Sequence, residues 1–111
     1  MTNLQETGGQ LVMKAGTPIL NETTLTLDRE RGVARLERVT LLFLRKMEAV
    51  PFREIDELSI KPEKDGASGA ERYLPVMRVA DGRVLSLPPI DDRAEAEETA
   101  SRIRKFVGLK H

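Results

Sequence analysis

The C-terminal stretch from Tyr73 to Leu109 constrains the fold more than any other part of the chain. It predicts a strand from Tyr73 to Ala80, a tight turn at Asp81-Gly82 and a returning strand from Arg83 to Leu87. Asp-Gly is the strongest short hairpin signal in the sequence, because a type I′ turn requires positive φ at both central residues. A single amphipathic helix follows, and it is the only element that can cover the strands upstream.

A two-residue turn at this position also predicts the register of the hairpin. Val79 then lies opposite Val84 on one face, and the same count places Arg78 opposite Leu85. Both residues of the first pair are apolar, whereas the second pair places a charged side chain opposite an apolar one. The sequence therefore supports the hairpin better than it supports the register.

The helix is expected to run from Asp92 to Val107, after Pro88-Pro89 has ended the sheet. Asp91 or Asp92 can cap its N-terminus, where the helix dipole favours negative charge. At the other end, Gly108 followed by an apolar residue is typical of a left-handed helix cap. Helical spacing predicts the buried stripe of this helix: Ala96, Ala100, Ile103 and Val107, with Phe106 beside it.

Upstream of the hairpin the sequence predicts short strands. Leu11 to Ala15 is a candidate first strand, and Thr24 to Asp28 alternates β-forming residues with a period of two. A turn over Arg29 to Gly32 leads to a returning strand over Val33 to Lys46. Within that strand, Leu41 to Leu44 is apolar on both faces, so the segment is either buried on two sides or covered by a partner.

Prolines and glycines divide the middle of the chain. Val50-Pro51 begins a corner, because a proline removes a ladder donor. The spacing of Ile55 and Leu58 indicates one helical turn there, and a strand over Leu58 to Ile60 follows. The stretch from Lys61 to Arg72 carries no large aliphatic or aromatic side chain and is expected to be a long exposed loop.

Length and composition indicate one globular domain. A chain of 111 residues can form one hydrophobic core of ordinary size but not two independent ones. Its 40% hydrophobic and 32% charged residues are typical of a globular protein rather than a disordered one. Residues 1–10 are polar, and we expect them to form a flexible N-terminal tail before a single domain over residues 11–111.

The order of these features resembles a small bacterial pleckstrin-homology-like (PH-like) domain. The resemblance implies an α+β, mainly β fold: a strongly bent antiparallel sheet, or a partly closed PH-like barrel, capped by one C-terminal α-helix. It also implies binding of peptides, partner proteins or lipid head groups rather than catalysis. Eukaryotic PH domains commonly carry tryptophan in the final helix, where this chain has Phe106. The matching segments are the Leu25-Thr26-Leu27-Asp28 strand, the Val50-Pro51-Phe52-Arg53-Glu54-Ile55 corner, the Asp81-Gly82-Arg83 turn and the final helix.

The sequence offers no set of residues for catalysis, and we expect no cofactor and no metal. It has no cysteine, and its one histidine, His111, is the last residue, so a thiol nucleophile and a transition-metal ligand set are both lacking. Asp91, Glu95 and Glu98 share a helix face that could hold a divalent cation, but capping and solvation explain the same residues. An enzyme whose acids are assembled only in space stays an alternative.

The most basic segment supplies the candidate binding residues. Arg29, Arg31 and Arg35 surround an early turn, and they loosely resemble the basic residues with which lipid-binding PH domains hold phosphates. Acidic residues, among them Asp28 and Glu30, interleave with them, and cross-strand pairing on a solvated face explains the same pattern. A net charge of zero and few aromatic residues argue against nucleic-acid binding.

We therefore expect a non-catalytic protein-interaction or assembly module with a PH-like fold. The apolar run from Leu41 to Leu44 and the open edges of small sheets favour self-association, and we expect a homodimer. The alternative is peripheral binding of anionic lipid through Arg29, Arg31 and Arg35. No apolar run approaches the length of a transmembrane helix, and residues 1–10 lack a signal-peptide core, so we expect a cytoplasmic protein without a transmembrane segment.

Overall fold

The computed structural model describes residues 2–17, 21–40, 44–64 and 66–109. Within these residues the chain is mainly β with one α-helix at its C-terminal end, as the sequence predicts. In chain order the elements are β1 (Thr2–Thr7), β2 (Gln10–Thr17), β3 (Asn21–Asp28), β4 (Val33–Thr40), β5 (Leu44–Pro51), the 3₁₀ turn η1 (Phe52–Glu54), β6 (Ile55–Lys64), β7 (Glu71–Val79), β8 (Val84–Ser86) and α1 (Arg93–Val107).

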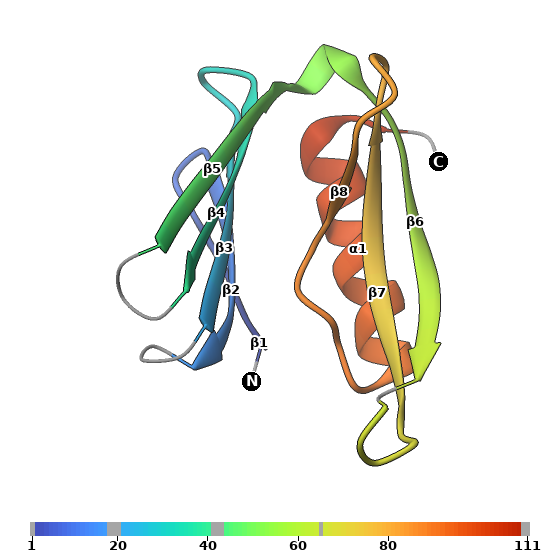
Figure 1. Cartoon of the computed structure of the whole chain (residues 1–111). Coiled ribbons are helices and arrows are strands. Elements are labelled where there is room, and N and C mark those ends of the chain that lie inside the picture. The colour runs from blue at the N-terminus through green and yellow to red at the C-terminus, as the bar shows by residue number, and fades with distance from the viewer. Residues whose placement is uncertain (1, 18–20, 41–43, 65, 110–111) are drawn as a thin grey trace.

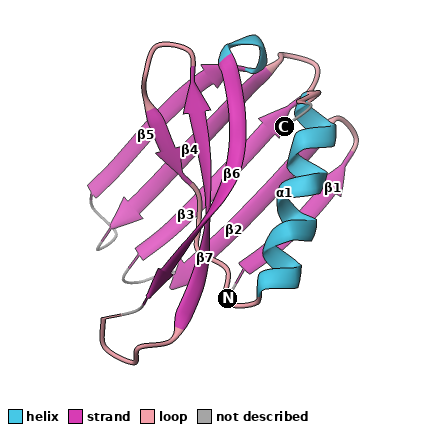
Figure 2. Cartoon of the chain, turned by 90° about the vertical axis from the view of Figure 1, so that its right-hand side faces the viewer, coloured by secondary structure: helices cyan, strands magenta, loops and turns pink. Residues whose placement is uncertain are grey.

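Two antiparallel sheets form two layers (Figure 1). The larger sheet has the order β1-β2-β3-β4-β5, and the smaller has β6-β7-β8 with α1 beside it. Together the smaller sheet and the helix cover the larger sheet (Figure 2). The predicted strands over Leu11 to Ala15 and Thr24 to Asp28 are confirmed within β2 and β3. The described strands do not close into a barrel, and the predicted antiparallel fold capped by a C-terminal helix is confirmed.

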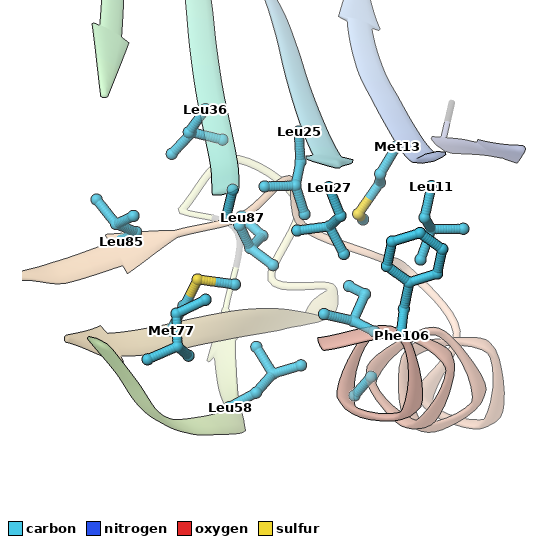
Figure 3. Packing of buried hydrophobic residues seen from close by; sticks show 14 of the residues in the cluster. Leu11, Met13, Leu25, Leu27, Leu36, Leu58, Met77, Leu85, Leu87 and Phe106 are labelled. Atoms are coloured by element: carbon cyan, nitrogen blue, oxygen red, sulfur yellow. The ribbon is translucent and has the colours of Figure 1, made fainter. Parts of the chain in front are cut away.

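The core lies between the two layers. β2, β3, β4 and β7 contribute alternate residues to it, as Leu25 and Leu27 of β3 show: both are buried, and the threonines beside them are not. Phe106 of α1 points toward Leu11 of β2 (Figure 3), so the helix seals one side of the sandwich. The buried cluster consists of Leu11, Met13, Leu25, Leu27, Ala34, Leu36, Val50, Ile55, Leu58, Met77, Val79, Leu85, Leu87, Ile90, Ala96, Ala100, Ile103 and Phe106.

The ends of α1 are those that the sequence predicts. Asp92 is the N-cap, and its Oδ2 accepts a hydrogen bond from the amide of Glu95 at 3.1 Å. Gly108 has a left-handed backbone with φ of 93°. Its amide and that of Leu109 both donate to the carbonyl of Arg104 at 2.8 Å. Backbone groups at both ends of the helix are therefore satisfied within the chain itself.

The face of α1 that meets the core is rotated slightly from the prediction. Phe106 is buried, whereas Val107, predicted for the stripe, is only half-buried. The ring of Phe106 meets that of Phe52 in η1 edge-on, with ring centroids 6.5 Å apart. This contact buries the Phe106 ring, which is larger than the Val107 side chain, and it joins the helix to the corner between the sheets. The buried helix residues are Ala96, Thr99, Ala100, Ile103 and Phe106.

The hairpin of β7 and β8 forms where predicted, but its register is shifted by one residue. Leu85 lies opposite Met77 rather than Arg78. The cause is a longer loop, in which the amide of Gly82 donates to the carbonyl of Val79 at 2.9 Å and Gly82 has positive φ. A type I turn followed by a left-handed glycine is a common three-residue hairpin loop. The shift pairs Leu85 with Met77, both buried, and leaves Arg78 opposite Val84, which is exposed.

The Asp81 carboxylate closes the same turn. Its Oδ1 accepts a hydrogen bond from the amide of Arg83 at 2.9 Å, and its Oδ2 accepts one from Nε of Arg83 at 2.7 Å. The backbone bond above all, and the guanidinium beside it, lower the pKa of the Asp81 carboxyl below its ordinary value. The stabilising effect is therefore present at neutral pH and is lost as the pH falls through the lowered pKa.

Two segments that were expected to be irregular are paired strands. The predicted flexible tail over residues 1–10 is wrong in that it contains β1, which pairs with β2 along its length. Half of the predicted loop over Lys61 to Arg72 is strand, because β6 and β7 pair as far as Lys64 opposite Glu71. Pro62 is tolerated there because β6 is an edge strand. Both segments have polar side chains, so their sequences did not indicate strands. They form strands nonetheless, because the hydrogen bonds between strands use backbone groups.

The predicted single strand over Val33 to Lys46 is also wrong. The chain reverses within it and forms the hairpin of β4 and β5, in which Thr40 lies opposite Leu44. The apolar run from Leu41 to Leu44 falls at this reversal, and its residues 41–43 lie outside the described residues. The helical turn predicted from the spacing of Ile55 and Leu58 is wrong, because these residues begin β6, and the 3₁₀ turn η1 lies before them.

Candidate interaction surface

The three arginines predicted to bind a ligand do not form one site. Arg29 is exposed, and its guanidinium carbon lies 4.2 Å from the centre of the Phe106 ring. The amide of Arg31 donates to Oδ1 of Asp28 at 3.2 Å, and its Nε lies 3.8 Å from Oδ2 of the same residue. Arg35 is half-buried on β4, on the face turned away from the core. Arg29 is thus directed to the helix, away from the other two.

A cavity of about 510 Å³ lies beside Arg31 and Arg35. Its walls also include Asp28 and Glu30 and the glycine-containing turn between β1 and β2. The two guanidinium groups are therefore offset by two carboxylates, and the cavity has no excess of positive charge. A phosphate group placed there would meet acidic side chains as well as basic ones.

A second cavity, of about 550 Å³, lies near the N-terminal end of α1. Arg72, Asp91 and Glu95 line it, and Nε of Arg72 is buried without a hydrogen-bond partner. Nη2 of Arg72 lies 3.6 Å from Oε1 of Glu63, so its charge is already partly offset. Among the described residues, no group of three or more histidine, cysteine, aspartate or glutamate side chains could hold a metal ion. His111 lies outside the described residues.

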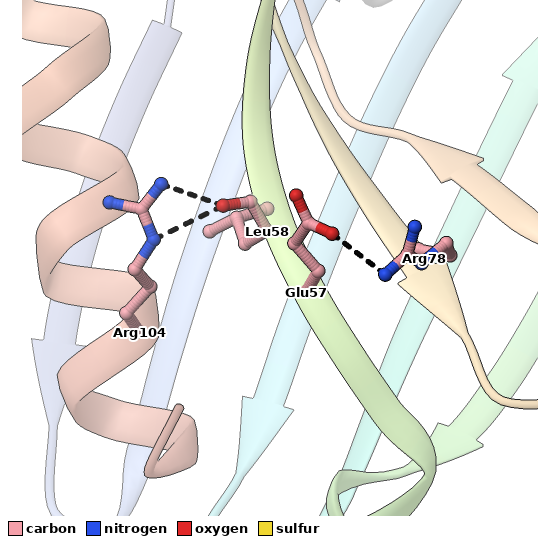
Figure 4. Close-up of polar contacts among 4 residues, drawn as sticks. All are labelled: Glu57, Leu58, Arg78 and Arg104. Atoms are coloured by element: carbon pink, nitrogen blue, oxygen red, sulfur yellow. Dashed lines mark hydrogen bonds and ion pairs between the residues drawn. The ribbon is translucent and has the colours of Figure 1, made fainter. Parts of the chain in front are cut away.

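An arginine side chain binds one backbone carbonyl on each edge of the smaller sheet. Edge strands present backbone groups that otherwise need water or a partner chain. On β6, the carbonyl of Leu58 accepts hydrogen bonds from Nε and Nη2 of Arg104 in α1, at 3.1 and 2.6 Å (Figure 4). On β8, the carbonyl of Ser86 accepts a hydrogen bond from Nη2 of Arg38 in the larger sheet, at 2.6 Å. These contacts also tie the two layers and the helix together.

Replacement of Arg104 by alanine is expected to lower the free energy of unfolding by about 1–2 kcal/mol, because a charged double donor to a half-buried carbonyl is lost. Urea unfolding followed by circular dichroism measures the change. Arg102→Ala is the matched control, since Arg102 makes only an exposed pair with Glu6 at 3.6 Å. The control should change stability by less than about 0.5 kcal/mol. Equal losses for the two variants would contradict the edge-closing role of Arg104.

β5 forms an edge of the larger sheet that no described side chain covers. It is eight residues long. Figures 1 and 2 show it at the outer side of the sheet, with no other element beyond it. Leu44 is 66% exposed and Met47 is 53% exposed, and both lie on this strand. The other large apolar side chain exposed in the described residues is Val84 of β8.

The pairing of β5 with β4 determines which of its backbone groups face outward. The amide of Phe52 donates to the carbonyl of Gly32 at 2.7 Å, directly beyond the last pair of the ladder. Hydrogen-bonded and non-hydrogen-bonded pairs alternate along an antiparallel ladder. Pro51 is therefore turned outward, where its missing N–H is tolerated. The outward backbone groups that remain belong to Arg45, Met47 and Ala49.

The β5 edge was not predicted from the sequence. Because Val33 to Lys46 was predicted as one strand, the next residues were expected to form a corner and not a strand of their own. The available signal was Pro51, because a proline at the end of a strand is typical of an edge position. The predicted partner contact at Leu41 to Leu44 adjoins the edge, although only Leu44 of that run is described.

The fold and this surface define a class: a mainly β protein of two antiparallel sheets, with a C-terminal helix and an exposed edge strand. Comparison of the sequence with protein-family models and with curated proteins gave no match. No helix in the described part of the chain is long and apolar enough to cross a membrane.

Proposed function

We propose that this chain is a non-catalytic protein-interaction module of PH-like fold that binds an extended segment of a partner along β5. The supporting observation is the β5 edge, which combines outward backbone groups with exposed Leu44 and Met47. An extended segment added to such an edge gains main-chain hydrogen bonds, and its alternate side chains give specificity. The arginine contacts on the smaller sheet favour β5 further, because each edge there has a carbonyl bound by a side chain of this chain.

The opposite edge of the larger sheet, β1, is a poorer binding surface. Its exposed side chains are polar, as at Gln5 and Thr7. Glu6 faces the helix and lies 3.6 Å from Nη2 of Arg102. A polar edge is typical of a strand that stays solvated. β5 differs because two large apolar side chains are exposed along it.

Binding of anionic lipid through Arg29, Arg31 and Arg35 is the alternative function, and it has less support. Asp28 and Glu30 offset the charge of two of these arginines, and the third lies over Phe106. Lipid attraction of about 1 kcal/mol per basic residue requires unbalanced positive charge near the membrane surface. We therefore propose protein binding rather than lipid binding.

An array of random octapeptides, probed with the wild-type chain and with Met47→Pro, tests the proposed function. Proline at this position removes the central outward N–H of β5 and none of its bonds to β4. We expect the wild type to bind a subset of peptides and Met47→Pro to lose that binding while it keeps the wild-type circular dichroism spectrum. Met47→Ala, which retains the N–H, is the control and should keep most of the binding.

Two results would contradict strand addition at β5. One is that the wild-type chain is monomeric and still binds no peptide on the array. The other is that Met47→Pro binds the same peptides as strongly as the wild type does, because the backbone of β5 then takes no part in binding.

A further inference from the structure

We infer that the segment received by β5 is β5 of a second copy of this chain, in an antiparallel register centred on Met47. This inference rests on the proposed function, since it names the partner of the same edge. A symmetric pair of this kind joins the two larger sheets into one continuous sheet. The chemistry of β5 supports it in three independent ways: charge, apolar contact and backbone hydrogen bonding.

Charge selects the register. When Met47 lies opposite Met47 of the second copy, Lys46 faces Glu48 of the second copy, and Glu48 faces its lysine in return. Registers centred on residues 45, 46 or 48 place two like charges opposite each other, and one centred on Ala49 leaves the lysine and the glutamate without opposite charges. Of these symmetric registers, only the Met47-centred one pairs both charges favourably. Within one chain, Nζ of Lys46 already lies 3.7 Å from Oε1 of Glu48, so both side chains are on the same face.

Apolar contact favours the same register. Leu44 lies opposite Val50 of the second copy, on the face that carries the core. The Met47 side chains meet each other on the other face. Met47 is therefore covered by its copy on the second chain, and this lowers the exposed apolar area, whereas Val50 is already fully buried in its own core. Arg45 lies opposite Ala49, so no charge faces a like charge.

Backbone geometry allows the pairing. The outward groups of β5 belong to alternate residues, 45, 47 and 49, and the register places each of them opposite another member of the same set. Every outward N–H in this set thus finds an outward carbonyl on the second copy. Pro51 lies beyond the last of these pairs, so its missing N–H removes none of the bonds. A register shifted by one residue along a single strand would break this match.

A charge-swap experiment tests the partner and the interface on the full chain. Sedimentation velocity should show a wild-type dimer, whereas Lys46→Glu and Glu48→Lys should each weaken it by at least about tenfold, because both facing pairs become like-charged. A mixture of these two variants should dimerise again, since each chain then faces opposite charges on the other. The double variant Lys46→Glu/Glu48→Lys should also recover the dimer. Recovery on mixing shows that both single variants are folded.

A crosslinking experiment tests the register. The chain has no cysteine, so Met47→Cys introduces one thiol per copy. Directly opposite hydrogen-bonded residues have Cα atoms about 5.5 Å apart, which lies within the range of a disulfide. Oxidation should therefore link the Met47→Cys chains into a covalent dimer. Ala49→Cys is the control and should not crosslink, because its two positions lie on opposite sides of the dimer axis.

Several outcomes would overturn the inference. These are a wild-type chain that stays monomeric at millimolar concentration, single charge variants that remain dimeric, a mixture that stays monomeric, or crosslinking at position 49 in preference to 47. The peptide array shows whether such a result contradicts only the second copy as partner or also the proposed function. A monomer that still binds octapeptides through β5 refutes the second copy as partner and leaves strand addition in place, whereas a monomer that binds none refutes both.

Discussion

Replacement of Ile103 by alanine is expected to lower the free energy of unfolding by about 2–5 kcal/mol. Ile103 lies in the middle of the buried face of α1 and is completely buried in the cluster that both sheets share. Alanine removes buried methyl and methylene groups and leaves a cavity that the surrounding strands can only partly fill. Its higher helix propensity returns less than about 1 kcal/mol. Urea unfolding followed by circular dichroism measures the loss.

Lys105→Ala is the matched control for this variant. Lys105 lies on the same helix and is exposed, so the change tests helix propensity without removing core contacts, and we expect less than about 0.5 kcal/mol. Wild type and variants should be compared at one protein concentration, because self-association would make stability depend on concentration. A loss at Ile103 no larger than that at Lys105 would show that α1 does not complete the core.

The second large effect is expected at Gly16, where alanine should cost at least about 2 kcal/mol. Gly16 has φ of +112°, a backbone conformation that side chains rarely adopt. A Cβ added there would also lie 2.1 Å from the carbonyl oxygen of Asn21 on the neighbouring strand. Because that oxygen belongs to the backbone, it cannot move away without disturbing the pairing of β2 with β3. Strain and overlap therefore act together.

Two other glycines separate these contributions. Gly82 has φ of +96° but no neighbouring atom within 4 Å of the added Cβ, so alanine there should cost about 1–2 kcal/mol from conformation alone. Gly66 has neither feature, and Gly66→Ala should be close to neutral. The expected order of stability loss is Gly16, then Gly82, then Gly66. Equal losses at Gly16 and Gly82 would contradict the close backbone approach between β2 and β3.

The features that sequence analysis predicted correctly are local. The cap of α1 at Asp92 and its end at Gly108 depend on residues within one helical turn, and both are confirmed. The hairpin around Asp81-Gly82 is confirmed as well. Its register was wrong because Asp-Gly suits both a two-residue and a three-residue loop, and Leu85 gains a buried position only in the second.

The candidate site was less predictable. Arg29, Arg31 and Arg35 are close in sequence. Arg29, however, lies over the ring of Phe106 in the helix, and this contact separates it from the others. The β5 edge was missed for a related reason. Whether Lys46 and Glu48 continue one strand or begin another depends on where the chain turns back, and the apolar run before them gave no turn signal.

The sequence by itself determined the mainly β composition, the C-terminal helix with both its ends, and the positions of the corner and the last hairpin. These depend on hydrogen bonds between near neighbours and on the residue-specific cost of a given φ. Only the tertiary structure decided which strands are edges, which arginines bind their carbonyls, and which edge exposes large apolar side chains. Every strand pairs with a neighbour in the sequence, but the packing of the two sheets and the helix brings together segments far apart in the chain, such as Arg38 with Ser86 and Arg104 with Leu58.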